Sequence, residues 1–162
     1  PQRSGSRRAA LRDGPVFGQI NPELPVARTI HAPVGIRHID GSETSLEELE
    51  GRRVFAFCGL GNPTAFFRTV EACGSILVGS QAFNDHHTYT NRCLAEIYEN
   101  SRSHDAQLVL TTSKDWGKIA PLIPSQPPLP MACLAVELQF QAAGTQLTSL
   151  IERVVGGRIV GL

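Results

Sequence analysis

The sequence predicts an α/β domain: a mostly parallel sheet with flanking helices, similar to half of a Rossmann fold, preceded by a β-hairpin linker. Strand-like apolar runs alternate four times with helical patterns, as they do in βαβ units. The loops between them have ordinary lengths, which favours right-handed crossovers. With 162 residues, 41% of them hydrophobic and 19% charged, the chain has the composition of a globular protein.

The first part of the chain lacks this pattern. Residues 1–25 show no sustained hydrophobic period, and we interpret them as a disordered end or a remnant of a preceding lobe. Residues 26–40 hold two β-like runs, one on each side of His31-Ala32-Pro33. This arrangement predicts a hairpin that turns at those three residues and ends at the turn-forming pair Asp40-Gly41. A capping pattern at 45–48 then predicts a short helix.

Residues 45–162 carry the α/β lobe itself. The continuous apolar run 54–58 is typical of a strand buried on both faces. Asn62 and Pro63 predict the start of a helix, which Gly74 ends. The predicted elements that follow are a strand over 75–79, a helix capped by Thr90, a strand over 108–112, a short helix over 113–120, a strand over 131–140 and a helix over 145–155.

Bulk properties exclude several classes of function. The formal net charge is +0, so there is no electrostatic case for nucleic-acid binding. The four cysteines are far apart and never form Cys-x-x-Cys, which argues against a disulfide framework or zinc site and favours a reducing cytosolic setting. No apolar run approaches the ~20 residues of a membrane span.

Two features indicate that the site is incomplete. The sequence contains neither a Gly-x-x-x-x-Gly-Lys-Ser/Thr loop nor a Gly-x-Gly-x-x-Gly loop for holding phosphate. The chain begins with Pro1, and its only methionine is Met131. We therefore expect a piece of a longer protein that supplies one part of a site.

The segment Asp85-His86-His87 is the first candidate site. It lies between a strand pattern and a helix pattern, where open α/β sheets bind ligands. A carboxylate beside an imidazole suits general acid–base work, but two adjacent histidines cannot both face one point. A loop cap at Asp85 and a surface position for His87 are the alternatives. Metal ligation is not favoured, because no third ligand lies at suitable spacing.

Two further places are weaker candidates. The loop from Gly59 to Pro63 precedes a helix N-terminus, which can receive an anion, although such loops usually serve to turn the chain. Lys114 follows a strand and opens a helix, so it either points into the same rim or is a solvated neighbour of the cap.

Three segments together carry a family resemblance. Residues 54–69 resemble a hydrophobic strand followed by Gly-x-x-x-Pro-x-x-Phe-Phe, residues 83–89 a Phe-x-Asp-His-His-x-Tyr motif, and residues 111–115 a Thr-Thr-Glu-Lys-Asp motif in which Ser113 replaces glutamate. In this order and spacing they resemble the tetraacyldisaccharide 4′-kinase family, the lipid A 4′-kinases of Gram-negative envelope synthesis. The resemblance covers residues 26–155.

The resemblance implies an enzyme that transfers the γ-phosphate of ATP to the 4′-hydroxyl of a tetraacyldisaccharide 1-phosphate. This chain resembles the hairpin linker and C-terminal lobe. Its partners would be the N-terminal P-loop lobe, which mainly binds ATP and Mg²⁺, and the lipid A precursor. The implied location is the cytoplasmic face of the inner membrane, with peripheral contact through the missing lobe.

The resemblance also implies residue roles. His86 reaches into the cleft between the lobes and supports an aspartate base of the other lobe, while Asp85 is its acidic neighbour. Lys114 is the candidate cofactor-binding residue. We expect the chain to be inactive alone. The alternatives are a stand-alone small-molecule-binding module and a structural remnant without catalysis.

Overall fold

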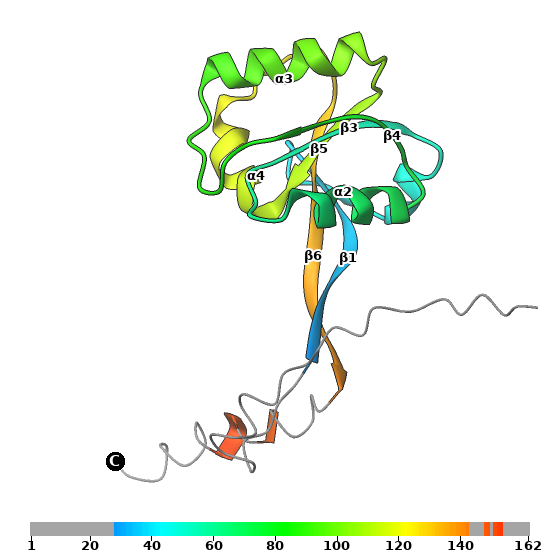
Figure 1. Ribbon diagram of the computed structural model, residues 1–162, viewed down its shortest axis with the longest axis vertical. Coiled ribbons are helices and arrows are strands. Elements are labelled where there is room, and N and C mark those ends of the chain that lie inside the picture. Colours follow the sequence, from blue (N-terminus) through cyan, green and yellow to red (C-terminus); the bar gives the residue numbers. More distant parts are fainter. Residues whose placement is uncertain (1–27, 143–147, 150, 154–162) are drawn as a thin grey trace, which may run out of the picture. The chain divides into compact units, whose positions relative to one another are not determined.

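The structure of the chain, a computed structural model, describes residues 28–142, 148–149 and 151–153. It divides into two compact units, one of residues 30–139 and one of the two chain ends, 1–29 with 140–162. The first unit holds the α/β lobe (Figure 1).

Part of the sequence prediction lies outside the described residues. This holds for the whole of segment 1–25 and for most of the helix predicted over 145–155. The described residues within that predicted helix, 148–149 and 151–153, are helical.

A six-stranded sheet in the order β2-β1-β6-β5-β3-β4 forms the centre of the lobe. Strands β3, β4, β5 and β6 are mutually parallel, and β2 is antiparallel to β1. The elements are β1 (Arg28–His38), β2 (Glu43–Thr44), the 3₁₀ helix η1 (Leu46–Leu49), β3 (Arg53–Cys58), α2 (Pro63–Ala72), β4 (Ile76–Ala82), α3 (Asn91–Ser103), β5 (Leu108–Thr112), α4 (Ser113–Ile119), the 3₁₀ helix η2 (Ala120–Leu122) and β6 (Met131–Ala142). The predicted fold class, a mostly parallel α/β sheet, is confirmed.

The first strand differs from its prediction. Residues 28–38 form one continuous strand, so the hairpin turn predicted at His31-Ala32-Pro33 is wrong. On its β2 side the strand tolerates Pro33, because β2 pairs only with Ile36 and Arg37 and Pro33 lies beyond that ladder. The chain turns instead at Asp40-Gly41, where His38 accepts a hydrogen bond from the Gly41 N–H at 3.1 Å.

Two other local predictions also need correction. The strand predicted over 75–79 extends to Ala82, because β4 pairs with β3, past a register shift between Val54 and Phe55, as far as Cys58 and Ala82. The segment predicted as a capped helix from Ser45 is a single 3₁₀ turn, and the Ser45 side chain makes no capping bond.

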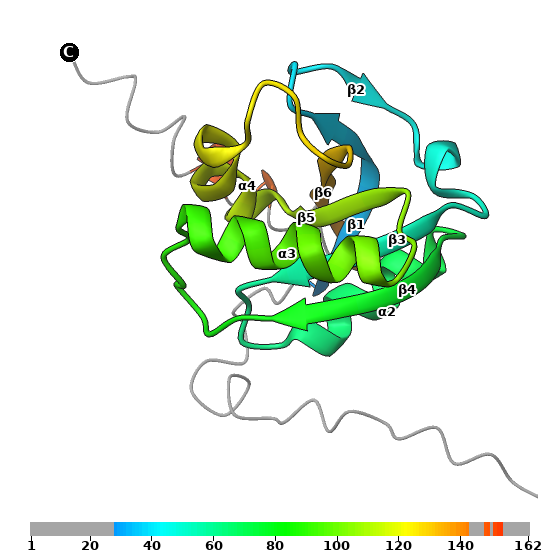
Figure 2. The same cartoon turned by 90° about the horizontal axis from the view of Figure 1, so that it is seen from above.

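Each face of the sheet has its own hydrophobic core. Along β3 the buried side chains alternate, so that Val54, Ala56 and Cys58 enter one cluster while Phe55 and Phe57 enter the other. The first cluster is closed by α2, and the second by α3 and α4. Figure 1 shows α2 and α3 on opposite sides of the sheet, and Figure 2 shows β2 and β4 at its two edges. The run 54–58 is thus buried on both faces, as predicted.

The two longer helices start where the sequence predicts. The Asn62 side chain accepts a hydrogen bond from the Ala65 N–H at the start of α2. Thr90 accepts one from the Cys93 N–H at the start of α3. Caps of this kind each contribute about 1 kcal/mol to stability.

No helix among the described residues has both the length and the hydrophobicity of a membrane span. All four cysteines are free thiols, and Cys58 and Cys133 are buried.

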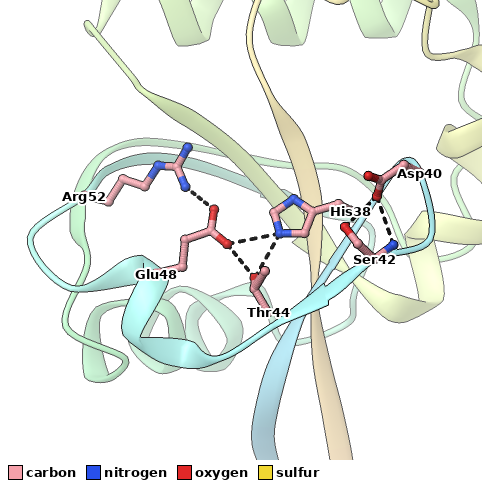
Figure 3. Close-up of polar contacts among 6 residues, drawn as sticks. All are labelled: His38, Asp40, Ser42, Thr44, Glu48 and Arg52. Carbon is pink, nitrogen blue, oxygen red and sulfur yellow. Dashed lines mark hydrogen bonds and ion pairs between the residues drawn. The ribbon is translucent and has the colours of Figure 1, made fainter.

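A network of half-buried polar side chains fixes the start of the lobe. Glu48 accepts a hydrogen bond from Thr44 at 2.5 Å, lies 3.0 Å from the His38 ring and pairs with Arg52 (Figure 3). Burial raises the pKa of the Glu48 carboxyl, but the bonds from Thr44 and Arg52 outweigh it, and the pKa lies below its ordinary value. The network ties β1 and β2 to η1.

We predict that this network makes stability depend on pH. Because the pKa of Glu48 is lowered in the folded state, its contribution is present above the unfolded pKa of about 4.3 and is lost as the pH falls through the folded value. Glu48→Gln should lower the free energy of unfolding by about 1 kcal/mol at pH 7 and flatten its dependence on pH below 5, measured by urea denaturation. Glu47→Gln, which changes an exposed neighbour in η1, is the matched control. Parallel losses for both variants would contradict this role.

Candidate functional site

The candidate site lies where the chain leaves adjacent strands toward opposite faces of the sheet. After β3 the chain enters α2 on one face, and after β5, which pairs with β3, it enters α4 on the other. Open α/β sheets bind ligands at such a switch point, beyond the carboxyl ends of the strands. The loop after β4, which carries Asp85 and His86, lies beside it.

Asp85 and Lys114, separated by 29 positions, form an ion pair at this edge. The Lys114 Nζ donates to the Asp85 Oδ1 at 2.5 Å. The bond from Lys114, followed by its charge, outweighs the opposing effect of burial and lowers the pKa of the Asp85 carboxyl. The side chains are 46% and 40% exposed, so both can meet a ligand or a second protein surface.

His86 stands at the rim and faces solvent. Its side chain is 81% exposed, and its Nε2 lies 3.8 Å from the Asp85 Oδ2. Its backbone has a φ of 60°, in the left-handed region that non-glycine residues seldom adopt. The His86 N–H donates to the Asp85 Oδ1 at 3.0 Å and so supports this conformation. The ring therefore lies free of apolar packing.

His87 has the opposite environment. Its ring stacks on Phe83 with centroids 4.6 Å apart, meets Tyr89 edge-on at 5.0 Å and lies 3.5 Å from the Cys93 Sγ. His87 is not a fully exposed surface residue: its ring is half-buried against the aromatic cluster under the loop. As the sequence predicts, only one of the two histidines faces the rim.

Asp115 is the residue that sequence reasoning missed. It is fully buried, and its Oδ2 accepts the Gly59 N–H at 2.9 Å and the Thr112 hydroxyl at 2.7 Å. The Gly59 N–H, a candidate anion donor, is thus occupied by a side chain of the protein itself. One signal for this contact was present: an acidic residue three positions after Thr112, a potential N-cap, at the start of a predicted helix.

A cavity opens at the switch point beside Lys114. It has a volume of about 470 Å³ and extends between α2, the start of α4 and β6. Its apolar walls include Leu60, Phe66 and Leu134, and Asn62 and Lys114 are among its polar groups.

The arrangement suits proton handling and charge positioning rather than metal binding. An exposed imidazole stands beside a carboxylate that an ammonium group keeps ionised. The described part of the chain contains no group of three or more histidine, cysteine, aspartate or glutamate residues that is suited to a metal ion.

Comparisons with known proteins agree on one family. The profile of the family described as tetraacyldisaccharide-1-P 4′-kinase (LpxK) matches residues 7–155. A tetraacyldisaccharide 4′-kinase from Syntrophus aciditrophicus is 35% identical over 118 residues, which are 72% of this chain and 31% of that protein. One from Rhodopseudomonas palustris is 38% identical over 130 residues, 80% of this chain and 36% of that protein. The chain thus spans about a third of the length of these relatives.

A solved structure supports the fold. The crystal structure of LpxK from Aquifex aeolicus, described as a complex with ATP, superposes with a TM-score of 0.52 at 21% identity. The match covers 85% of this chain and 40% of that one.

We predict that Lys114 sets the ionisation of Asp85. In Lys114→Gln the ammonium group is lost, so the pKa of Asp85 should rise toward its ordinary value of about 3.9. A pH titration of the Asp85 side-chain carbon by NMR measures this. Lys118→Gln, which removes an ammonium group that bonds the His87 carbonyl from the same helix, should leave the Asp85 pKa unchanged. An unmoved pKa in Lys114→Gln would mean that the ion pair does not form in solution.

Proposed function

Because the chain belongs to the tetraacyldisaccharide-1-P 4′-kinase family, we propose that it is the C-terminal lobe of a lipid A kinase. The complete enzyme would transfer the γ-phosphate of ATP to the 4′-hydroxyl of a tetraacyldisaccharide 1-phosphate. Its other lobe, with the phosphate-binding loop, would lie N-terminal to this segment.

The observation that carries this proposal is the presentation of His86. The residue is conformationally restrained at its backbone, yet its ring is 81% exposed and touches a carboxylate of the same loop. Such an exposed ring can act in catalysis once another lobe of the enzyme brings a reacting group within its reach. We infer that the imidazole supports an aspartate base of the other lobe, which takes the proton of the 4′-hydroxyl as that oxygen attacks. Phosphoryl transfer depends mainly on such positioning.

Asp85 and Lys114 would keep this imidazole in place. The carboxylate bonds the backbone of His86 and faces its ring, while the ammonium group holds the carboxylate. Lys114, at the mouth of the cavity, would also attract a phosphate oxygen.

The fit of this chain to ATP and Mg²⁺ is limited. ATP supplies the phosphoryl group when bound, and Mg²⁺ neutralises its charge. In the described residues, the Gly59 N–H is bonded to Asp115 and the Asp85 carboxylate to Lys114, so neither is free for a phosphate or a metal. We propose that the N-terminal lobe binds both, that it also makes the peripheral membrane contact, and that the enzyme works at the cytoplasmic face of the inner membrane.

We predict that His86→Asn in the chain completed with the N-terminal lobe of a relative lowers turnover by about 10²-fold. Asparagine tolerates the left-handed backbone, so the free energy of unfolding should stay close to that of the parent protein. Transfer of ³²P from ATP to the tetraacyldisaccharide 1-phosphate measures turnover, and urea denaturation measures stability.

His87→Ala is the matched control in the same loop. It should lower stability by about 1 kcal/mol, because it removes an aromatic stack, and should change turnover much less than the change at 86. Equal losses of turnover in the two variants would refute the role of His86. Rapid turnover by the 162-residue chain alone would refute its dependence on a second lobe.

A further inference from the structure

We propose that Asp115 is the positioning residue of this site: it joins three loops at the carboxyl edge of the sheet and so fixes the Asp85–Lys114 pair and His86. The proposal concerns the geometry of the loops. Only its consequence for turnover rests on the proposed function.

The first connection joins the ends of β3 and β5. The Asp115 Oδ2 accepts from the Gly59 N–H at 2.9 Å and from the Thr112 hydroxyl at 2.7 Å, and the Asp115 N–H donates back to the Thr112 Oγ1 at 3.1 Å. Both the Asp115 and Thr112 side chains are buried. Hydrogen bonds to a buried carboxylate are stronger than those between neutral groups, so this contact holds the two strand ends together.

The other carboxylate oxygen lies next to the loop after β4, close to Asn84 and Tyr89. A Cβ placed on Gly59 would lie 3.1 Å from the Asp115 Oδ1, 3.2 Å from the Asn84 carbonyl oxygen and 3.3 Å from the Tyr89 hydroxyl. These three groups therefore surround one point above Gly59, and a methyl group there would push them apart by a few tenths of an ångström.

The Tyr89 phenol lies beside the Asp115 carboxylate at this point. Burial, together with the charge of Asp115, raises the pKa of the Tyr89 phenol, so the hydroxyl remains protonated beside the carboxylate. Within the described residues, neither the Tyr89 hydroxyl nor the Asp115 Oδ1 has a hydrogen-bond partner of good geometry. The phenol and the carboxylate oxygen therefore interact electrostatically rather than through a well-aligned hydrogen bond.

Asp115 thereby acts on both members of the ion pair. Lys114 is its neighbour in the first turn of α4, and Asn84, beside the same point, immediately precedes Asp85. A shift at Asp115 would therefore change the distance between the ammonium group and the carboxylate. His86, which bonds Asp85 through its backbone, would follow.

The experiment compares Asp115→Ala with Asp115→Asn in the 162-residue chain. Alanine removes both side-chain bonds, and the NMR-measured pKa of Asp85 should rise toward about 3.9 as the ion pair loosens. Asparagine keeps an oxygen for Gly59 and Thr112, so it should retain most of the low pKa. Gly59→Ala, which pushes a methyl group between the three loops, should raise the pKa without removing Asp115 and serves if Asp115→Ala does not fold.

Thr111→Val is the control for general destabilisation. Thr111 is buried in β5 and donates to the Phe57 carbonyl of β3 at 2.9 Å, so the variant loses a buried hydrogen bond within the sheet and not one between the loops. It should lower stability and leave the Asp85 pKa unchanged. An unmoved Asp85 pKa in both Asp115→Ala and Gly59→Ala, or an equal rise in Thr111→Val, would overturn the proposal.

A second readout separates this proposal from the function of the site. In the chain completed with the N-terminal lobe, Asp115→Ala should lower kcat by about 10²-fold, the size expected when a group is misplaced by about 1 Å, and leave the KM for ATP unchanged. A raised Asp85 pKa with an unchanged kcat would support the positioning role and count against the catalytic role of Asp85 and His86.

Discussion

The arrangement of this lobe depends on strand β3, which is buried on both faces and paired on both edges. Its alternate side chains supply the two hydrophobic clusters, and β4 and β5 pair with it in parallel on either side. Because a parallel neighbour can be reached only by a crossover, the helices before and after β4 must cover the sheet from opposite faces. The loops that leave β3 and its neighbours are consequently forced together at one end of the sheet.

That crowding explains why charged groups appear there in a lobe with otherwise apolar interior surfaces. Loops that meet without a common strand have no shared backbone ladder, so side chains must connect them. Asp115 makes such a connection in the buried interior, and the Asp85–Lys114 pair makes another at the surface. The buried contact is protected from salt and water, whereas the exposed pair is screened and contributes little to stability. The outer pair is therefore free to serve a ligand or a second surface.

Much of this arrangement was predictable from the sequence. The continuous apolar run of β3 and the caps at Asn62 and Thr90 act locally, through burial pattern and side-chain bonds within three residues, so the sequence showed them directly. The single strand over 28–38 was hidden by Pro33, which predicts a break when the segment is considered alone. Its position beyond the β2 ladder is a property of the sheet rather than of the segment.

The candidate site likewise combines features that the sequence predicts with features that only the fold reveals. The motif positions drew attention to Asp85, His86 and Lys114, but only the fold shows that a bond spans the 29 positions between Lys114 and Asp85. The different environments of His86 and His87 follow from one left-handed residue, which sends adjacent rings in different directions. Asp115 could not be assigned from sequence, because its main partner, Gly59, is 56 positions away and contributes a backbone group.

The left-handed backbone at position 86 has a consequence for substitution tolerance. Folding there admits glycine, asparagine and aspartate readily and penalises β-branched residues, whatever the site does. Histidine is among the non-glycine residues that adopt this conformation more often than most, although glycine adopts it without a steric penalty. In a library randomised at position 86, selection for folded protein and selection for the proposed activity of the completed enzyme would enrich different amino acids. The difference between the two sets of amino acids would measure how much the imidazole ring itself contributes.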